Sequence, residues 1–319
     1  MNLGLHRFAV VVAVATLLLI AAGGLVTSTE SGLSVPDWPT TYGQNPFTFP
    51  ISKWVGGIRF EHSHRLIAST VGLLTVVLAV WLARREPRAW ARRLGYAALA
   101  AVVAQGVLGG LTVLFLLPTA VSVAHACLAQ TFFCLVVTLA VVTSPAWLEA
   151  RPAKADRTAR VAAATVAVVY LQLLVGAVMR HTKAGLAIPD FPLALGRVVP
   201  PLASFPVAIH FAHRIGAVGV FSAAAVCLVE ARRSRRPGLP RTAILLASLV
   251  VVQIGLGALT VLSRKDVALT TAHVVVGALV LGSSLVLAFQ SRRTVRLRAV
   301  ARTLDDAAHH GSRPRVISR

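Results

Sequence analysis

Apolar residues dominate eight segments of the chain, each about 20 residues long, and polar residues fill the connections between them. A helix of that length crosses a hydrocarbon core of roughly 30 Å. The segments do not alternate apolar and polar positions, which excludes the strands of a membrane β-barrel. In lipid each segment must satisfy its own backbone hydrogen bonds, so we predict eight spanning helices. Their approximate ranges are 8–28, 62–82, 94–115, 121–142, 160–180, 205–229, 242–262 and 268–289.

The second half of the chain repeats the motifs of the first half. For example, Gly-Leu-Ser-Val-Pro-Asp-Trp-Pro at 32–39 returns as Gly-Leu-Ala-Ile-Pro-Asp-Phe-Pro at 185–192. The other repeated pairs are 61–65 with 210–214, 105–113 with 253–261, and His125 with His273. Because each half has four helices, both halves enter the membrane in the same direction. We predict an all-α integral membrane protein of two tandem four-helix bundles, related by a pseudo-twofold axis along the membrane normal.

The repeat also sets the domain boundaries. We assign residues 1–145 to the N-terminal half and residues 158–290 to the C-terminal half, with a polar connection at 149–156. We expect residues 291–319 to form a basic, disordered cytoplasmic tail. The first apolar run is too long for the apolar region of a signal peptide, and it ends like the fifth run, so we interpret it as a retained helix.

The composition agrees with a membrane location and explains the charge. Apolar residues make up 56% of the chain and charged residues 13%, whereas soluble domains carry about 25% charged residues. The net charge of +21 is concentrated in the connections on one side, namely 84–93, 151–160, 231–241 and the C-terminal tail. This is the positive-inside pattern, so we predict a multi-pass protein of the bacterial cytoplasmic membrane, with both termini cytoplasmic and no nucleic-acid partner.

The chain contains three cysteines, Cys127, Cys134 and Cys227, and all of them lie within predicted helices. Cys127 and Cys134 are two turns apart on one helix, which is a poor geometry for a disulfide. We interpret the three residues as small apolar fillers.

Four histidines lie at matched depth in the apolar segments, about one turn from the outer ends of their helices: His64, His125, His213 and His273. Ionisable groups within the membrane are costly and usually functional. In each half one histidine comes from the second helix and one from the fourth, so a flat cofactor fits between them. Two separate pairs favour the axial ligands of a haem iron. A zinc or copper site is the alternative, but it requires the two pairs to meet.

Arginines and glycines accompany these histidines. Arg65 and Arg214 directly follow His64 and His213, and a guanidinium at the membrane surface pairs well with a haem propionate. The alternative is a snorkelling side chain. Glycines flatten helix faces where a macrocycle approaches, or they allow close helix packing. These glycines are Gly106, Gly109, Gly110, Gly255 and Gly257.

The two halves differ beside their first histidines. Glu61 and His64 share one helix face because they are three residues apart, whereas His210 takes the place of Glu61 in the second half. A carboxylate at the desolvated outer end of a helix bundle can transfer protons. The alternative is an acid at the membrane interface that is paired with Arg65 or Arg59. We predict that the first half performs chemistry and that the second half holds a permanent haem.

Together these motifs resemble those of the haem A synthase family, and the resemblance spans nearly the whole chain. It implies an oxidoreductase that converts the C8 methyl of haem O to a formyl group, giving haem A for terminal oxidases. It further implies that His64 and His125 hold the substrate haem, that Glu61 is the catalytic carboxylate, and that His213 and His273 bind haem b as the cofactor.

The resemblance also implies partners, namely the haem O synthase (protohaem farnesyltransferase) and assembly factors of terminal oxidases. Many bacterial members carry a cysteine pair in the first outer loop, but residues 29–60 contain none. Either the electron route differs here or the chain belongs to a cysteine-free branch.

Two other functions stay open. A non-catalytic two-haem electron-transfer cytochrome would not need the difference between Glu61 and His210. A transporter with a histidine proton relay would show helix breaks near the midplane, whereas the prolines here lie mostly in outer loops or at helix ends.

Overall fold

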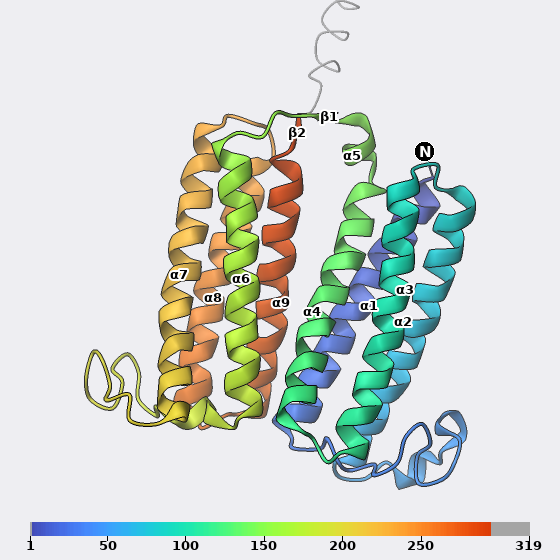
Figure 1. Cartoon of the computed structure of the whole chain (residues 1–319), viewed down its shortest axis with the longest axis vertical. Coiled ribbons are helices and arrows are strands. Elements are labelled where there is room, and N and C mark those ends of the chain that lie inside the picture. Colours follow the sequence, from blue (N-terminus) through green and yellow to red (C-terminus); the bar gives the residue numbers. More distant parts are fainter. Residues whose placement is uncertain (1, 295–319) are drawn as a thin grey trace, which may run out of the picture.

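The computed structural model describes residues 2–294, which fold almost entirely into helices (Figure 1). Eight helices in this range are long and apolar enough to cross a membrane, which confirms the eight predicted spans. They are α1 (Leu3–Ser28), α2 (Ile58–Arg85), α3 (Ala89–Leu114), α4 (Thr119–Val142), α6 (Arg157–His181), α7 (Phe205–Arg233), α8 (Leu239–Leu262) and α9 (Val267–Gln290). Of the predicted tail, residues 295–319 lie outside the described residues.

Most helices begin a few residues before the apolar runs, and polar side chains cap the first turns of three of them. The side chains of Asn2, Asp156 and Asp266 each accept a hydrogen bond from a backbone N–H in the first turn of α1, α6 and α9. Such caps satisfy N–H groups that have no partner within the helix. The spans are therefore longer than the apolar pattern alone indicates.

The four histidines consequently lie deeper than predicted. His64, His125 and His273 are the seventh residues of α2, α4 and α9, and His213 is the ninth residue of α7. At about 1.5 Å rise per residue, each is nearly two turns from the outer end of its helix rather than one. The matched depth itself is as the sequence predicted.

The eight helices lie side by side in two sets (Figure 1). Within the first set, α1 and α3 each contact α2 and α4; within the second set, α6 and α8 each contact α7 and α9. The two sets meet along a seam where α1 contacts α9 and α4 contacts both α6 and α9. The pseudo-twofold axis stays a prediction from the repeated sequence.

Small residues allow the helices of the seam to approach closely. A Cβ atom at Gly24 on α1 would lie 3.4 Å from a methyl carbon of Thr271 on α9, and one at Gly282 on α9 would lie 3.1 Å from the ring of Phe133 on α4. Close contact of backbones through small residues is the usual way in which helices associate in lipid. The seam is therefore tightly packed along α9.

Short elements complete the chain. The helix α5 (Pro145–Glu149) precedes the strand β1 (Arg151–Pro152), which pairs antiparallel with β2 (Arg293–Thr294). Neither strand was predicted, because two-residue pairings leave no periodic pattern. Arg293 reinforces them by donating to the carbonyl of Ala150 at 3.0 Å. The outer loops contain three 3₁₀ turns, η1 (Pro46–Thr48), η2 (Ile51–Lys53) and η3 (Ala184–Leu186).

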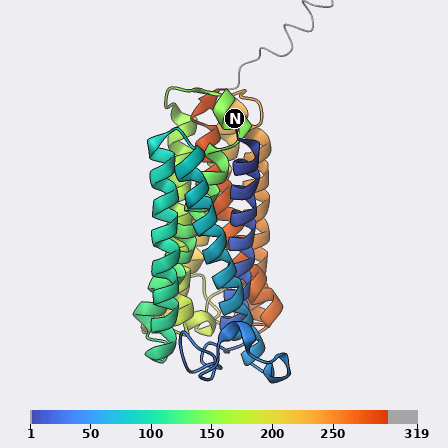
Figure 2. The same ribbon diagram turned by 90° about the vertical axis from the view of Figure 1, so that its right-hand side faces the viewer.

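The connections divide between two ends of the molecule. The basic connections 84–93, 151–160 and 231–241 lie at the end where α1 begins, and the long loops 29–57 and 182–204 lie at the opposite end (Figures 1 and 2). The structure thus separates the two groups of loops as the charge pattern predicts. Which end faces the cytoplasm stays a prediction.

Candidate functional site

The four histidines form two pairs, one in each set of helices. The ring centres of His213 and His273 are 6.4 Å apart, with an angle of 69° between the ring planes. His64 and His125 are each the seventh residue of their helix, and the two helices α2 and α4 both pack against α1 and α3. The structure therefore brings together the residues that the sequence pairs.

The spacing of the second pair fits a haem iron. Metal–imidazole bonds are about 2 Å long and the ring nitrogen is about 1 Å from the ring centre, so two imidazoles on opposite sides of one metal have centres about 6 Å apart. The observed 6.4 Å agrees with this. Among residues 2–294 no cluster of three or more His, Cys, Asp and Glu side chains has the arrangement of a metal site. This disfavours a single zinc or copper centre built from all four histidines.

Each histidine packs against a glycine on the preceding membrane-spanning helix. The Cε1 atom of each imidazole lies 3.0–3.2 Å from the position that a Cβ atom would take at that glycine. The pairs are His64 with Gly23, His125 with Gly109, His213 with Gly176, and His273 with Gly257. Such distances are too short for any other residue without a shift of the ring. The glycines therefore form a cradle that sets where each imidazole lies.

The sequence singled out only part of this cradle. Gly109 and Gly257 were predicted to matter, whereas Gly23 and Gly176 were missed although they occupy equivalent places in the two repeats. Gly106 and Gly255 have open space where a side chain would go. They do not contact the histidines, and they serve below as controls.

Glutamines support the second histidine pair. The Nε2 atom of Gln172 lies 3.1 Å from Nδ1 of His213 and donates to the carbonyl of His213 at 2.7 Å. The Nδ1 atom of His273 lies 3.1 Å from the carbonyl oxygen of Gln253. A hydrogen bond that Nδ1 donates, as from His273 to the Gln253 carbonyl, fixes the ring orientation and leaves Nε2 free for a metal. The amide of Gln172 instead donates toward Nδ1 of His213, so it must present its Oε1 atom to that ring before Nε2 can bind a metal. The sequence did not assign these roles, although an amide within an apolar run was the available signal.

The first pair lacks this support. Gln105 donates to the carbonyl of His125 at 2.9 Å, but among the described residues Nδ1 of His64 and Nδ1 of His125 are buried without a hydrogen-bond partner. The residue equivalent to Gln172 is Leu19, which offers no hydrogen bond. The two imidazoles of the first half are therefore held less firmly than those of the second half.

Arg65 and Arg214 hold the outer loops. The guanidinium of Arg65 donates to the carbonyls of Val35, Asp37 and Thr40 at 2.7–3.0 Å. The guanidinium of Arg214 donates to the carbonyls of Ile188, Asp190 and Leu193 at 2.7–3.0 Å. Each arginine thus ties a loop across the outer end of its helix set, next to a histidine.

Glu61 and His210 each accept a hydrogen bond from a backbone N–H of the adjacent loop, one through a carboxylate and the other through an imidazole. Glu61 is 3% exposed; its Oε2 atom accepts from the N–H of Val35 at 2.9 Å and its Oε1 atom accepts from Arg65 at 2.7 Å. The Nδ1 atom of His210 accepts from the N–H of Ile188 at 3.3 Å. The exchange of acid for imidazole therefore preserves the loop anchor and changes only the charge beside the site.

Two aspartates shape the loops themselves. Asp37 accepts from the N–H groups of Tyr42 and Gly43 at 2.7 and 2.8 Å, and Asp190 accepts from those of Leu195 and Gly196 at 2.8 Å. Burial alone would raise the pKa of Asp37, but hydrogen bonds from Gly43, Thr40 and Tyr42 hold that pKa below its ordinary value. The charged form of the carboxylate therefore stabilises the turn.

Two further histidines have other surroundings. His62 is fully buried at the outer loop, where its Nδ1 atom lies 3.2 Å from Oγ1 of Thr41 and its ring lies 4.7 Å from that of Trp54. This residue therefore packs the first loop onto α2. His181 ends α6 at the seam between the two helix sets.

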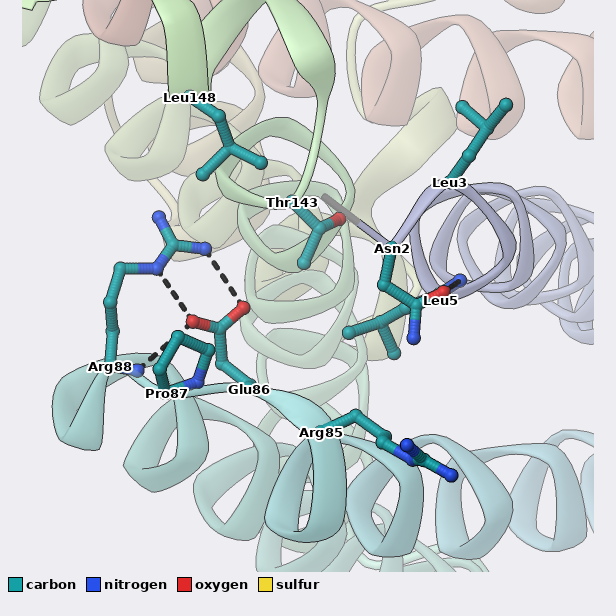
Figure 3. A pocket seen from close by; sticks show the side chains of 9 residues that line it. All are labelled: Asn2, Leu3, Leu5, Arg85, Glu86, Pro87, Arg88, Thr143 and Leu148. Carbon is teal, nitrogen blue, oxygen red and sulfur yellow. Dashed lines mark hydrogen bonds and ion pairs between the residues drawn. The ribbon is translucent and has the colours of Figure 1, made fainter.

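A cavity of about 680 Å³ lies at the other end of the molecule, where α1 begins (Figure 3). Its wall includes Glu86 and Arg88, which are joined by an ion pair at 2.7 Å, and this pair lowers the pKa of the Glu86 carboxyl. Arg88 also donates to the carbonyl of Val142 at 2.9 Å. The pair fastens the turn between α2 and α3 to the end of α4, and it lies far from the four histidines.

The fold and the paired histidines define a class, that of multi-pass helical membrane proteins with paired imidazoles suited to haem. Residues 6–54 and 57–285 match the COX15-CtaA family, described as cytochrome oxidase assembly protein. Since the match covers most of the chain, the protein belongs to this family.

Curated relatives carry the name Heme A synthase. The chain is 29% identical to that of Halalkalibacterium halodurans over 292 residues, covering 86% of this chain and 93% of the relative. It is 34% identical to that of Symbiobacterium thermophilum over 259 residues, covering 76% and 81%. It is 31% identical to that of Caulobacter sp. strain K31 over 335 residues, covering 89% and 94%.

Proposed function

We propose that this protein is a haem A synthase, an oxidoreductase that converts the C8 methyl group of haem O to a formyl group and so yields haem A. The name of its relatives supports haem A synthesis. The observation that carries the proposal is the presence of two histidine pairs with unequal support, of which only the first has a carboxylate beside it.

The unequal support is the basis on which we assign roles to the two halves. Residues 158–290 would hold haem b through His213 and His273, whose Nδ1 atoms have hydrogen-bond partners. Residues 1–145 would hold haem O as substrate through His64 and His125, whose Nδ1 atoms have none. Firmly oriented ligands suit a permanent cofactor, whereas loosely held ligands suit a molecule that must leave after each turnover.

The residues around the first pair would carry the proton chemistry. Converting a methyl to a formyl group replaces two hydrogens by one oxygen and is an oxidation by about four electrons, for which an external electron acceptor and an oxygen donor are needed; a nearby base would take up the protons that are released. Glu61 lies three residues from His64 on one helix face, and its carboxylate is the acidic group placed for this task. Haem b, when bound, would supply one-electron redox chemistry. The loop held by Arg65 would limit the access of water.

The remaining partners follow from the same proposal. The N–H groups of Arg65 and Arg214 that do not donate to loop carbonyls are candidates for hydrogen bonds to haem propionates. Haem O synthase (protohaem farnesyltransferase) would supply the substrate, and terminal oxidase assembly factors would receive the product. With basic connections facing inward, both termini would lie in the cytoplasm of a bacterial cell.

The alternative is a two-haem electron-transfer cytochrome. One observation favours it, because Glu61 and His210 anchor equivalent loop residues and the difference between them then needs no catalytic meaning. The two functions differ in whether cells without the protein lose haem A.

Pigment extraction tests the proposal. Cells that lack the protein should accumulate haem O and lose haem A, and unchanged haem A would refute the assignment. His64→Ala and His125→Ala should abolish the product while the purified protein keeps its haem b spectrum. His213→Ala should lose that spectrum instead, and the opposite pattern would exchange the roles of the halves.

A further inference from the structure

Arg180 crosses the seam between the two helix sets. It lies in the last turn of α6, which belongs to the second set, and its Nη2 group reaches α1 of the first set. There it donates to the carbonyl of Gly24 at 3.1 Å and to Oγ of Ser28 at 3.0 Å. Ser28 in turn accepts from Thr271 of α9 at 3.3 Å. The guanidinium is thus fixed at the junction of three helices.

The positive charge of Arg180 has no acidic partner. None of the ion pairs among residues 2–294 includes it, and the Nε and Nη1 groups have no hydrogen-bond partner in that range. The carbonyl of Gly24 and the hydroxyl of Ser28 accept hydrogen bonds from one nitrogen, but neither group is charged, so the positive charge is not compensated. Placing an unpaired cation in such surroundings is costly unless an anion joins it. Because Nη2 is engaged, the free Nη1 group can donate a charge-assisted hydrogen bond to one oxygen of a carboxylate.

The position of Arg180 is between the two histidine pairs. Its Nη2 group bonds the carbonyl of Gly24, next to the Gly23 that packs against His64, and the hydroxyl of Ser28, which accepts from Thr271 two residues before His273. In the first repeat the equivalent residue is Thr27, which carries no charge. Of these two equivalent positions, only the one in the second repeat therefore carries a cation.

The other arginines near the sites are differently engaged. The Nη groups of Arg65 and of Arg214 each donate to three loop carbonyls. Arg180 instead keeps two nitrogens free beside the histidine pair that would hold haem b. A haem carries two propionate carboxylates at its edge. A haem bound by His213 and His273 would therefore place these anions within the membrane.

We propose that Arg180 binds a propionate carboxylate of the haem held by His213 and His273, through its free Nη1 group. This inference rests on the proposed function. Arg180 would then serve two purposes, since it joins the halves through Nη2 and fixes the haem edge at the seam through Nη1.

Reconstitution with two porphyrins tests this contact. Protein expressed without haem is titrated with protohaem and with its dimethyl ester, in which the propionates carry no charge. Binding is followed by the absorbance of the haem. The natural protein should bind protohaem about tenfold or more tightly than the ester, as expected for a charge-assisted pair. Arg180→Gln should abolish most of that preference and should bind the ester as the natural protein does.

Two matched variants separate this role from simple packing. Ser28→Ala removes a bond between α1 and α6 but keeps the cation, so it should retain the preference. Arg197→Gln removes an exposed charge in the outer loop of the same half and should retain it as well. An unchanged preference in Arg180→Gln would overturn the inference, and so would an equal loss in Ser28→Ala. Failure of the natural protein to bind either porphyrin would refute the proposed function together with it.

Discussion

The Cε1 atom of His273 on α9 lies 3.0 Å from the position that a Cβ atom would take at Gly257 on α8. A methyl group there forces the imidazole away from its place. Overpacking of this kind costs about 1 kcal/mol or more, which corresponds to roughly fivefold or more weaker haem binding. We therefore expect Gly257→Ala to lower the haem b content of the purified protein, measured by its reduced-minus-oxidised spectrum.

The matched control lies two residues earlier on the same helix. A Cβ atom at Gly255 would meet no other atom within 4 Å, so Gly255→Ala should keep the full haem b spectrum. Equal haem content in both alanine variants would contradict the idea that the glycine positions the ring.

Replacement of Gln172 by leucine should weaken the binding of haem b. The change removes the amide beside Nδ1 of His213 and installs the residue that the first repeat has at the equivalent Leu19. When Nε2 of His213 binds iron, Nδ1 carries the ring proton and Gln172 must offer its Oε1 atom as the acceptor. Loss of such an outer partner typically lowers metal affinity about 10- to 100-fold. Haem titration of the variant measures the effect. Gln130, whose Oε1 atom has no partner among the described residues, offers Gln130→Leu as the control, which should leave the affinity unchanged.

Exchange of Glu61 for histidine separates anchoring from chemistry. His210 holds its loop through an imidazole, so Glu61→His should fold and keep the first loop in place. Without the carboxylate, product formation should fall about 100-fold or more, in line with the loss of a general acid or base. Product is measured by pigment extraction and loop order by hydrogen exchange. Full activity in this variant would make Glu61 an anchor alone.

The turn at Asp37 should respond to pH. Because its pKa is lowered in the folded loop, the carboxylate contributes stability above its ordinary pKa of about 3.9, and this contribution disappears as the pH falls through the lowered value. Hydrogen-exchange protection of Tyr42 and Gly43, corrected for intrinsic rates, should stay constant from neutral pH to about 4 and then fall.

The variant Asp37→Asn should lose roughly tenfold of that protection at neutral pH, since a hydrogen bond to a charged group is worth about 1.5 kcal/mol or more. It should also show no further loss in acid. Glu30→Gln, which changes an exposed acid at the start of the same loop, should behave like the natural protein. A pH response that persists in Asp37→Asn would assign it to another group.

The membrane-spanning helices could be predicted from the sequence because the backbone must satisfy its own hydrogen bonds in lipid. An apolar run of sufficient length must be a helix, so eight helices followed directly from the pattern, with errors of a few residues at the helix ends. The strands β1 and β2 were not readable, because their pairing depends on residues 151 and 293 meeting in space.

The four histidines and Glu61 were found from the sequence, since duplication shows which polar residues recur at fixed places in apolar surroundings. The glycine cradles, the partners of Nδ1 and the loop contacts of Arg65 and Arg214 were decided only by the tertiary structure. Each of these features depends on the distance between two different helices, or between a helix and a loop. A linear pattern records which face a residue occupies, and the packing of neighbouring helices determines which atoms that face touches.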